Sequence, residues 1–89
     1  MEFEFDPAKS AANRAKLGID FVEAQRLWDD PIGLEIGPFQ HPEVRLGWVA
    51  HLDGRVWTAI FTRRGGRIRL ISARRARKDE VTRYEQTNR

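Results

Sequence analysis

The chain has 89 residues, enough for one small domain and too few for a second independent core, so we expect residues 1–89 to fold as a single domain. Hydrophobic residues make up 40% and charged residues 33% of the chain, a balance that excludes the disordered class. The absence of cysteine excludes disulfides and thiolate metal sites, and no apolar run reaches the roughly 20 residues of a membrane span. We therefore expect a cytoplasmic protein.

Charge is distributed unevenly along the sequence. Residues 55–78 contain nine Lys or Arg and no acidic residue, whereas residues 1–53 contain ten acidic residues against five basic ones. This polarity favours a basic face that binds phosphates. A solvated arginine-rich strand is an equally good interpretation of the charge alone.

The first 18 residues predict a short strand and a helix. Glu2–Phe5 alternates polar and aromatic residues, which is typical of a strand. Asp6 can cap a helix whose first position is Pro7, and Gly18 can end it in the left-handed conformation. Three alanines stand at helical spacing within it, Ala8, Ala12 and Ala15.

A second helix and an edge strand are predicted next. Asp20 and Glu23 form an Asp version of the capping box, and the helix should end near Asp30. Its apolar stripe consists of Phe21, Ala24, Leu27 and Trp28. The Gly- and Pro-rich segment that follows has room for a short edge strand at Leu34–Ile36.

The rest of the chain predicts a meander of three strands and a last helix. The expected segments are Val44–Leu52, Arg55–Thr62, Arg67–Ser72 and the helix Lys78–Gln86, with hairpin turns at Asp53-Gly54 and Gly65-Gly66. Val81 and Tyr84 should bury the last helix against the core. The fold class is α+β, with an N-terminal strand and two helices packed on a three- to four-stranded antiparallel sheet.

The hairpin turns fix a register. Two-residue turns pair Leu52 with Arg55 and Arg64 with Arg67, so that Arg45, Thr62 and Arg69 align on one face. The other face carries Leu46, Phe61 and Leu70, which the two early helices should cover. The face of Arg45, Thr62 and Arg69, here called the arginine face, is then expected to stay open.

Two segments, "FDPAKSAANRAKLGIDFVEAQRLWDDP" and "FTRRGGRIRLISARRARKDE", resemble the BrnT family of type II toxin–antitoxin ribonucleases. The resemblance implies a RelE-like fold and a toxin that cleaves RNA without a metal or other cofactor. It also implies a BrnA-like antitoxin as partner, which neutralises the toxin and represses the shared operon.

The family-like positions are Asp6, Lys9, Asn13, Lys16, Gly18, Phe21, Pro31, Arg45, Ser72, Arg74, Ala76 and Glu80. Two positions depart from the family pattern. Leu17 stands where relatives commonly have His, and Arg77 stands where a Thr often caps the last helix. Only Glu80 remains of that capping box, and any role of the missing histidine is absent here.

Metal-free RNA cleavage requires stabilisation of charge on the phosphate and a group that moves protons. We predict Arg45 and Arg69 as phosphate clamps because the guanidinium fork binds two oxygens at once, with Arg74 closing the site. His41 is the preferred acid or base over His51, although a turn histidine before Pro42 is an alternative reading. Glu43 is a further candidate base, and the alternative interpretation is an exposed carboxylate at the rim of the site.

The predicted RNA-binding residues are Lys9, Lys16, Thr62, Arg64 and Arg67. Lys9, Asn13 and Lys16 share one helix face, which could follow an RNA backbone or simply be solvated. Trp57 is either core or a platform for base stacking. The alternative function is a non-catalytic module of the same fold that binds nucleic acid or protein, including a toxin that lost activity with the change at Leu17.

Overall fold

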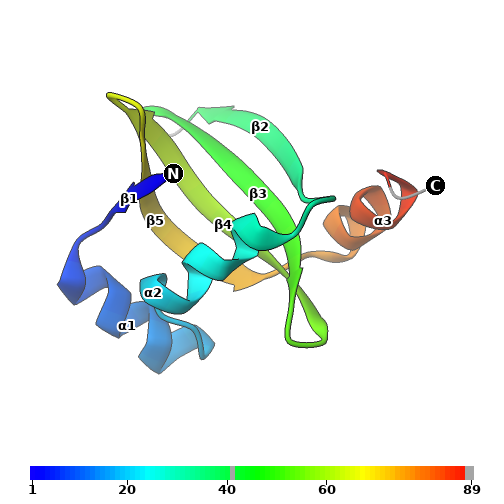
Figure 1. Ribbon diagram of the computed structural model, residues 1–89, viewed down its shortest axis with the longest axis horizontal. Helices are drawn as coiled ribbons and strands as arrows, with labels where there is room; N and C mark the ends of the chain where they lie inside the picture. The colour runs from blue at the N-terminus through cyan, green and yellow to red at the C-terminus, as the bar shows by residue number, and fades with distance from the viewer. Residues whose placement is uncertain (41, 88–89) are drawn as a thin grey trace.

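The computed structural model describes residues 1–40 and 42–87 (Figure 1). Its elements are β1 (Glu2–Glu4), α1 (Pro7–Leu17), α2 (Phe21–Ala24), the 3-10 helix η1 (Gln25–Asp29), β2 (Leu34–Gln40), β3 (Val44–Leu52), β4 (Arg55–Arg64), β5 (Arg67–Arg75) and α3 (Lys78–Thr87). Within these described ranges, no helix has the length and apolar character needed to cross a membrane.

The strands form one five-stranded sheet in the order β1-β5-β4-β3-β2. Strands β2 to β5 make an antiparallel meander, and β1 pairs in parallel with β5, with Glu2 opposite Arg67 and Glu4 opposite Arg69. The α+β class is therefore confirmed, while the N-terminal strand joins the sheet instead of packing on it. The edge strand β2 continues past Ile36 to Gln40.

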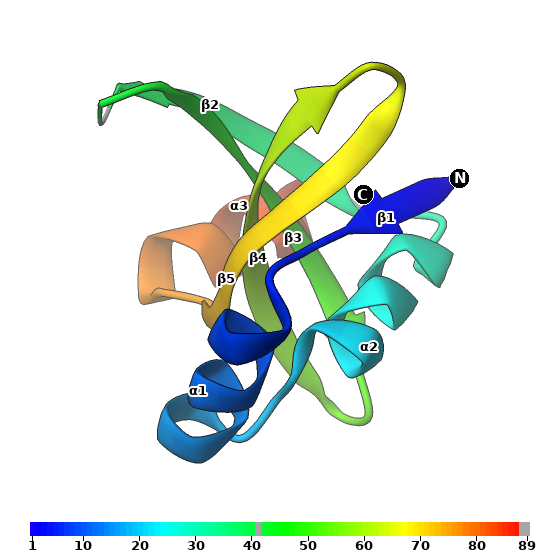
Figure 2. The ribbon, with the colours of Figure 1, turned by 90° about the vertical axis from the view of Figure 1, so that its left-hand side faces the viewer.

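The main core lies where α1, α2 and η1 cover one face of the sheet, as predicted. Phe21, Phe61 and Leu70 are almost completely buried there. Trp28 of η1 stacks on Trp48 of β3 at a centroid distance of 5.7 Å. Figure 2 shows these helices on one side of the curved sheet and α3 on the other.

The predicted helix caps are present. The carboxylate of Asp6 accepts from the backbone N–H of Ala8, and Gly18 ends α1 with φ of 84°. Asp20 and Glu23 form a complete capping box for α2. The predicted second helix tightens after Ala24 into the 3-10 helix η1, where the carbonyl of Leu27 accepts a bond from the indole of Trp48.

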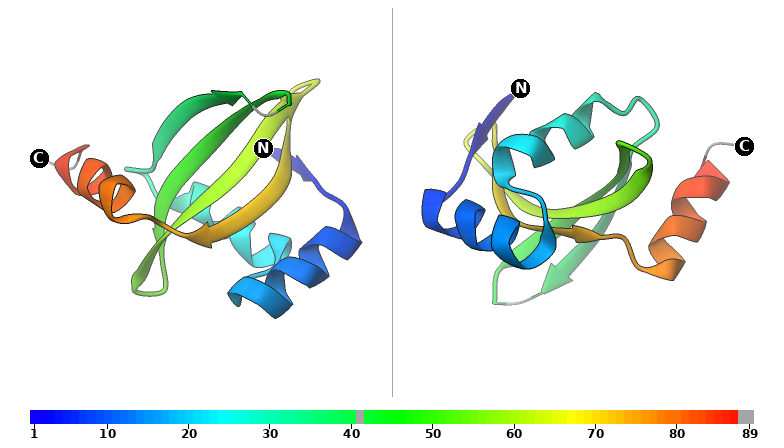
Figure 3. Two further views of the ribbon diagram at one scale, coloured as in Figure 1. Left: turned by 180° about the vertical axis from the view of Figure 1, so that it is seen from behind. Right: turned by 90° about the horizontal axis from the view of Figure 1, so that it is seen from below.

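Helix α3 lies on the arginine face, which is therefore only half open. Tyr84 is buried against Ile36 and Val49, and its hydroxyl donates to Asp30 at 2.6 Å. This anchors the helix as expected, but through a second small core on the face opposite α1 and α2, whereas Val81 is only half-buried. Figure 3 shows the same separation of α3 from the other helices. The expectation of a fully open face is thus corrected.

A bulge in β5 changes which residues share a face. Phe61 pairs with Leu70, but the preceding Ile60 pairs with Ser72, so Ile71 is an extra residue. Beyond it, Arg74 lies opposite Thr58. Strict alternation from Arg69 would have turned Arg74 toward the core, whereas the bulge places it on the arginine face. The strand also extends beyond the predicted end at Ser72.

Polar residues make the buried side of α1. Its spaced alanines are exposed, whereas Ser10 and Asn13 are buried. The amide of Asn13 donates to the carbonyls of Ile19 at 2.7 Å and Ala73 at 2.9 Å, and its oxygen accepts from the Ala73 N–H. Asn13 therefore joins α1 to β5 and cannot contact an RNA backbone.

Replacing Asn13 by alanine should lower the free energy of unfolding by about 2–3 kcal/mol, because two buried carbonyls and one N–H lose their partner. Urea denaturation measures the loss. Lys16→Ala, on the exposed side of the same helix, is the control and should change stability by less than about 0.5 kcal/mol. Equal stability of the two variants would contradict this role of Asn13.

Candidate functional site

A basic cleft of about 400 Å³ opens on the uncovered half of the arginine face. It is lined by Lys9, Glu43, Val44, Arg45, Thr62, Arg63, Arg64, Arg69 and Ile71. We call it the arginine cleft. Five of the predicted site residues thus come together, from α1 and three neighbouring strands.

The predicted register explains this convergence. Leu52 pairs with Arg55, Arg64 with Arg67, and Thr62 with Arg69, as the hairpin turns required. The pairing of β3 with β4 begins at Leu46 and Phe61, so Arg45 lies just beyond it on the face of Thr62. The row of Arg45, Thr62 and Arg69 therefore borders one cleft.

Arg45 and Arg69 keep hydrogen-bonding capacity for a ligand. The side chain of Arg45 is 30% exposed, and its nearest carboxylate, Glu43, is 3.8 Å away. The buried Nε of Arg45 has no hydrogen-bond partner within the described part of the chain, which is rare for a buried donor. Arg69 forms no ion pair within the described residues, and the ion pair of Arg45 with the exposed Glu43 is a long one. An anion between these guanidinium groups would satisfy both.

The outer arginines already lie beside carboxylates. Arg64 is 3.7 Å from Glu4, and Arg67 is 3.7 Å from Glu2. All four belong to the end where β1 meets the last hairpin, and Arg67 lines a neighbouring hollow, not the arginine cleft. Because both arginines are more than half exposed, these pairs are weak and leave the guanidinium groups able to attract phosphate.

Lys16 and Leu17 of α1 lie outside the cleft. Lys9 lines it, but Lys16 does not, and Lys16 is exposed farther along the helix. Leu17, where relatives commonly have His, is 42% exposed at the C-terminal end of α1 and is also absent from the lining. The departure at Leu17 therefore lies outside the arginine cleft.

Arg74 is held by a buried glutamate. Its guanidinium donates to both carboxylate oxygens of Glu80, at 2.7 and 3.0 Å. The Thr58 hydroxyl and the Arg77 N–H also donate to Glu80, at 2.9 and 2.8 Å. Glu80 is thus both the remaining half of the capping box of α3 and the group that fixes the orientation of Arg74.

These contacts lower the pKa of Glu80. Burial alone would raise the pKa, but the bonds from Arg74, from the Arg77 N–H and from Thr58 outweigh it and bring it from 4.5 to about 2. Glu80 is therefore charged at neutral pH and balances the positive charge of Arg74.

Arg74 lines a second, smaller hollow of about 230 Å³, together with Phe39, Arg45, Ile60 and Arg77. Since Arg45 lines both spaces, the two adjoin.

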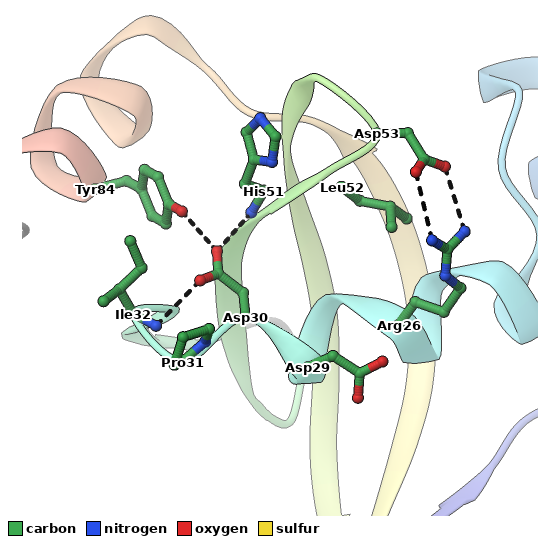
Figure 4. Close-up of a pocket in the computed structure, with 9 residues that line it drawn as sticks. All are labelled: Arg26, Asp29, Asp30, Pro31, Ile32, His51, Leu52, Asp53 and Tyr84. Atoms are coloured by element: carbon green, nitrogen blue, oxygen red, sulfur yellow. Dashed lines mark hydrogen bonds and ion pairs between the residues drawn. The ribbon is translucent and has the colours of Figure 1, made fainter.

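The sequence offers two histidines as candidates for proton transfer. His41 lies outside the described residues. His51 is exposed and borders a third hollow, of about 460 Å³, which contains Asp29, Asp30 and Asp53 (Figure 4). This hollow is acidic, so it disfavours phosphate.

Asp30 is structural within this acidic hollow. Its carboxylate accepts from the Tyr84 hydroxyl and from the backbone N–H groups of His51 and Ile32 (Figure 4). Burial would raise the pKa of Asp30, but these bonds and the nearby His51 lower it below its usual value. Asp30 therefore holds α3 to the end of η1.

Trp57 belongs to the core. Its side chain is buried, and the guanidinium of Arg75 lies 5.8 Å from its ring centroid. Stacking of a base on Trp57 is therefore not supported. The sequence analysis did not identify a different aromatic residue, Phe39. The signal that could have pointed to it is the turn-forming pair Gly37-Pro38 directly before it.

No group of three or more potential metal ligands occurs among residues 1–40 and 42–87.

Comparison with known families agrees with the resemblance of the sequence. A family model described as "Ribonuclease toxin, BrnT, of type II toxin-antitoxin system" matches residues 5–80. The matched range contains the whole arginine cleft and ends at Glu80, the partner of Arg74. No curated protein shows significant similarity to the chain.

Glu80→Gln tests the pairing with Arg74. A carboxyl whose folded-state pKa is lowered stabilises the fold above its unfolded pKa, near 4.5, and loses that effect as the pH falls toward about 2. At pH 7 the variant should therefore be less stable by roughly 3 kcal/mol, and the difference should shrink by more than half near pH 3. Thermal unfolding at several pH values measures it. Glu85→Gln, on an exposed part of α3, is the control, and a difference that does not change with pH would contradict the pairing.

Proposed function

The chain belongs to the BrnT family of ribonuclease toxins of type II toxin–antitoxin systems, and from this premise we propose that the arginine cleft is where RNA, specifically mRNA, is cut. One observation carries the proposal. Arg45 and Arg69 come from strands on either side of β4 and line the same cleft. Among the described residues Arg69 forms no ion pair, and the long ion pair of Arg45 with the exposed Glu43, at 3.8 Å, leaves the Arg45 guanidinium group able to bind an anion. Two such guanidinium groups suit the two non-bridging oxygens of a phosphodiester.

The proposed reaction is attack of the 2′-hydroxyl on the adjacent phosphorus. The 2′ oxygen forms a bond to phosphorus as the 5′ oxygen leaves, so the products end in a 2′,3′-cyclic phosphate and a 5′-hydroxyl. Negative charge grows on the phosphate oxygens in the transition state. Arg45 and Arg69 stabilise this charge.

Proton transfer is assigned to the turn before β3. Glu43 lines the cleft 3.8 Å from Arg45, so its carboxylate can take the proton of the 2′-hydroxyl. His41, two residues earlier in the sequence, stays the preferred acid or base, with Glu43 as the other candidate. Arg74, oriented by Glu80, borders the next space and binds the neighbouring phosphate.

The charges of the cleft favour chemistry without a metal ion. Five cationic side chains and one carboxylate line it, and their field opposes entry of a divalent cation. The proposed stabilisation of the phosphate comes from guanidinium groups alone. Lys9, Thr62 and Arg64 would position the RNA backbone around them.

The partner we propose is a BrnA-like antitoxin, with growth arrest in its absence and the cytoplasm as the place of action. An acidic or amphipathic segment of the antitoxin could cover the arginine cleft and keep RNA out. Association should then depend on salt, because it joins opposite charges.

A non-catalytic nucleic-acid or protein-binding module of the same fold is the second candidate. It is favoured by one observation: within the described part of the cleft lining, Glu43 is the sole carboxylate and no histidine is present. A site of this composition binds phosphate without needing to move protons.

The purified protein should cleave a single-stranded RNA in the presence of EDTA. Arg45→Ala and Arg69→Ala should each lower the cleavage rate on the order of 10²-fold, because each removes a group that stabilises the transition state. Gel analysis of the products measures the rate, and circular dichroism checks that both variants fold. Arg83→Ala, on the exposed side of α3, is the matched control and should cut normally.

The two candidates separate in the same assay. RNA binding that is lost in the two cleft variants, without any cutting by the unaltered protein, supports the binding module. Cutting that survives in Arg45→Ala and Arg69→Ala removes the arginine cleft as the site.

A further inference from the structure

The smaller space beside the arginine cleft, here called the Phe39 hollow, differs from it in character. The hollow measures about 230 Å³ and is lined by Phe39, Arg45, Ile60, Arg74 and Arg77. Phe39 is 40% exposed, so much of its ring surface is open to a ligand, and Ile60 adds a second apolar surface. A hydrophobic ring thus lies among three cations, directly next to the proposed phosphate site.

Two separate bulges bring residues to this hollow. In β2 the pairing shifts between Ile36, opposite Gly47, and Phe39, opposite Arg45. Regular pairing would have placed Pro38 opposite Arg45 and turned Phe39 to the other face, whereas the extra residue turns Phe39 onto the arginine face. The bulge in β5 does the same for Arg74. Bulges that redirect side chains in this way are common next to active sites.

The chain around Gly37 is fitted to hold Phe39 in this position. Gly37 has φ of 105°, a conformation that side chains rarely adopt. A Cβ there would lie 3.2 Å from the carbonyl oxygen of Arg45 and 3.3 Å from the nitrogen of Phe39. Arg74 is fixed as well, because Glu80 holds both of its terminal nitrogens. The lining is therefore preorganised on two sides.

We propose that the Phe39 hollow is a nucleobase subsite, which holds a base adjacent to the cleaved phosphate by stacking on Phe39. The inference rests on the proposed function of the arginine cleft. Stacking of one base on an aromatic side chain contributes about 1–3 kcal/mol and accepts every base, since each has a π face. The planar guanidinium groups of Arg74 and Arg77 offer further stacking surfaces.

Charge and size favour a nucleotide over a protein side chain as the occupant. Arg45, Arg74 and Arg77 surround the hollow, and no carboxylate lines it among the described residues. Glu80 is buried in its bonds to Arg74 and its neighbours, and Glu43 lies 3.8 Å from Arg45 on the side of the arginine cleft. A base brings its own phosphates to these cations. The volume is below the range of about 300–1,000 Å³ that is usual for drug-sized ligands, and so suits a single base.

The test combines a protein variant with an altered RNA. The cut position is first mapped on a short single-stranded RNA, and the nucleotides on each side of it are then replaced, one at a time, by abasic residues. In the unaltered protein, one of these replacements should lower kcat/KM by about 5- to 100-fold, as loss of one stacked base predicts. Phe39→Ala should lower kcat/KM on intact RNA by a similar factor and should lose nothing further on the abasic RNA.

Two controls accompany the variant. Phe39→Trp keeps a ring and should retain both the rate and the sensitivity to the missing base. Val22→Ala removes an exposed apolar side chain from α2, outside the cleft and the hollow, and should behave as the unaltered protein.

Each outcome decides the inference. Equal abasic penalties in the unaltered protein and in Phe39→Ala would overturn the subsite and leave the arginine cleft intact as the cutting site. If the unaltered protein binds RNA without cutting it, the same comparison is made on dissociation constants by fluorescence anisotropy, and the same factors are expected. If it neither cuts nor binds, both proposals fail. Normal RNA kinetics in Phe39→Ala together with a weakened antitoxin complex would assign the hollow to a protein partner instead.

Discussion

One extra residue in β5 places Arg74 on the same face of the sheet as Arg45 and Arg69. Because side chains alternate between faces, a shift of one position moves every later residue of a strand to the other side. Ile71 introduces this shift after Leu70, so Arg69 before it and Arg74 after it both face away from α1, α2 and η1. A second bulge, in β2, brings Phe39 to the same face. The hollow beside the arginine cleft depends on these two irregularities, whereas the row of Arg45, Thr62 and Arg69 in the cleft follows from the hairpin register.

Charge compensation then distinguishes arginines that the sequence makes look alike. Glu80 satisfies Arg74 and fixes its orientation, while the carboxylates of β1 lie beside Arg64 and Arg67. Among the described residues Arg69 forms no ion pair, and Arg45 has only a long one, 3.8 Å, with the exposed Glu43. The buried Nε of Arg45 has no acceptor among the described residues, which costs stability. The side chain of Arg45 is 30% exposed and lines the basic cleft, so its guanidinium group can still bind an anionic ligand there. The hollow around Asp30 carries negative charge instead, and Asp30 holds α3 in place through its bond from Tyr84.

Much of the fold followed from local signals. The caps at Asp6 and Asp20 and the two hairpin turns set the helices and the register from Leu46 to Leu52 and from Arg67 to Leu70. The β5 bulge escaped prediction because the break in alternation at Leu70-Ile71 is equally compatible with a strand that ends at Ser72, and the β2 bulge because it lies in the Gly- and Pro-rich segment after Ile36. The position of α3 also escaped it, because Tyr84 contacts Asp30 and Val49, which are distant in sequence. Asn13 was read as surface because its polarity hid a buried structural role.

The most direct measurement is an experimental structure of the protein bound to an RNA whose cleaved nucleotide carries 2′-deoxyribose, which prevents the attack and traps the substrate. The account predicts non-bridging oxygens of that phosphate at about 2.7–2.9 Å from the guanidinium nitrogens of both Arg45 and Arg69. RNA bound at another surface, with no phosphate between these two side chains, would contradict it.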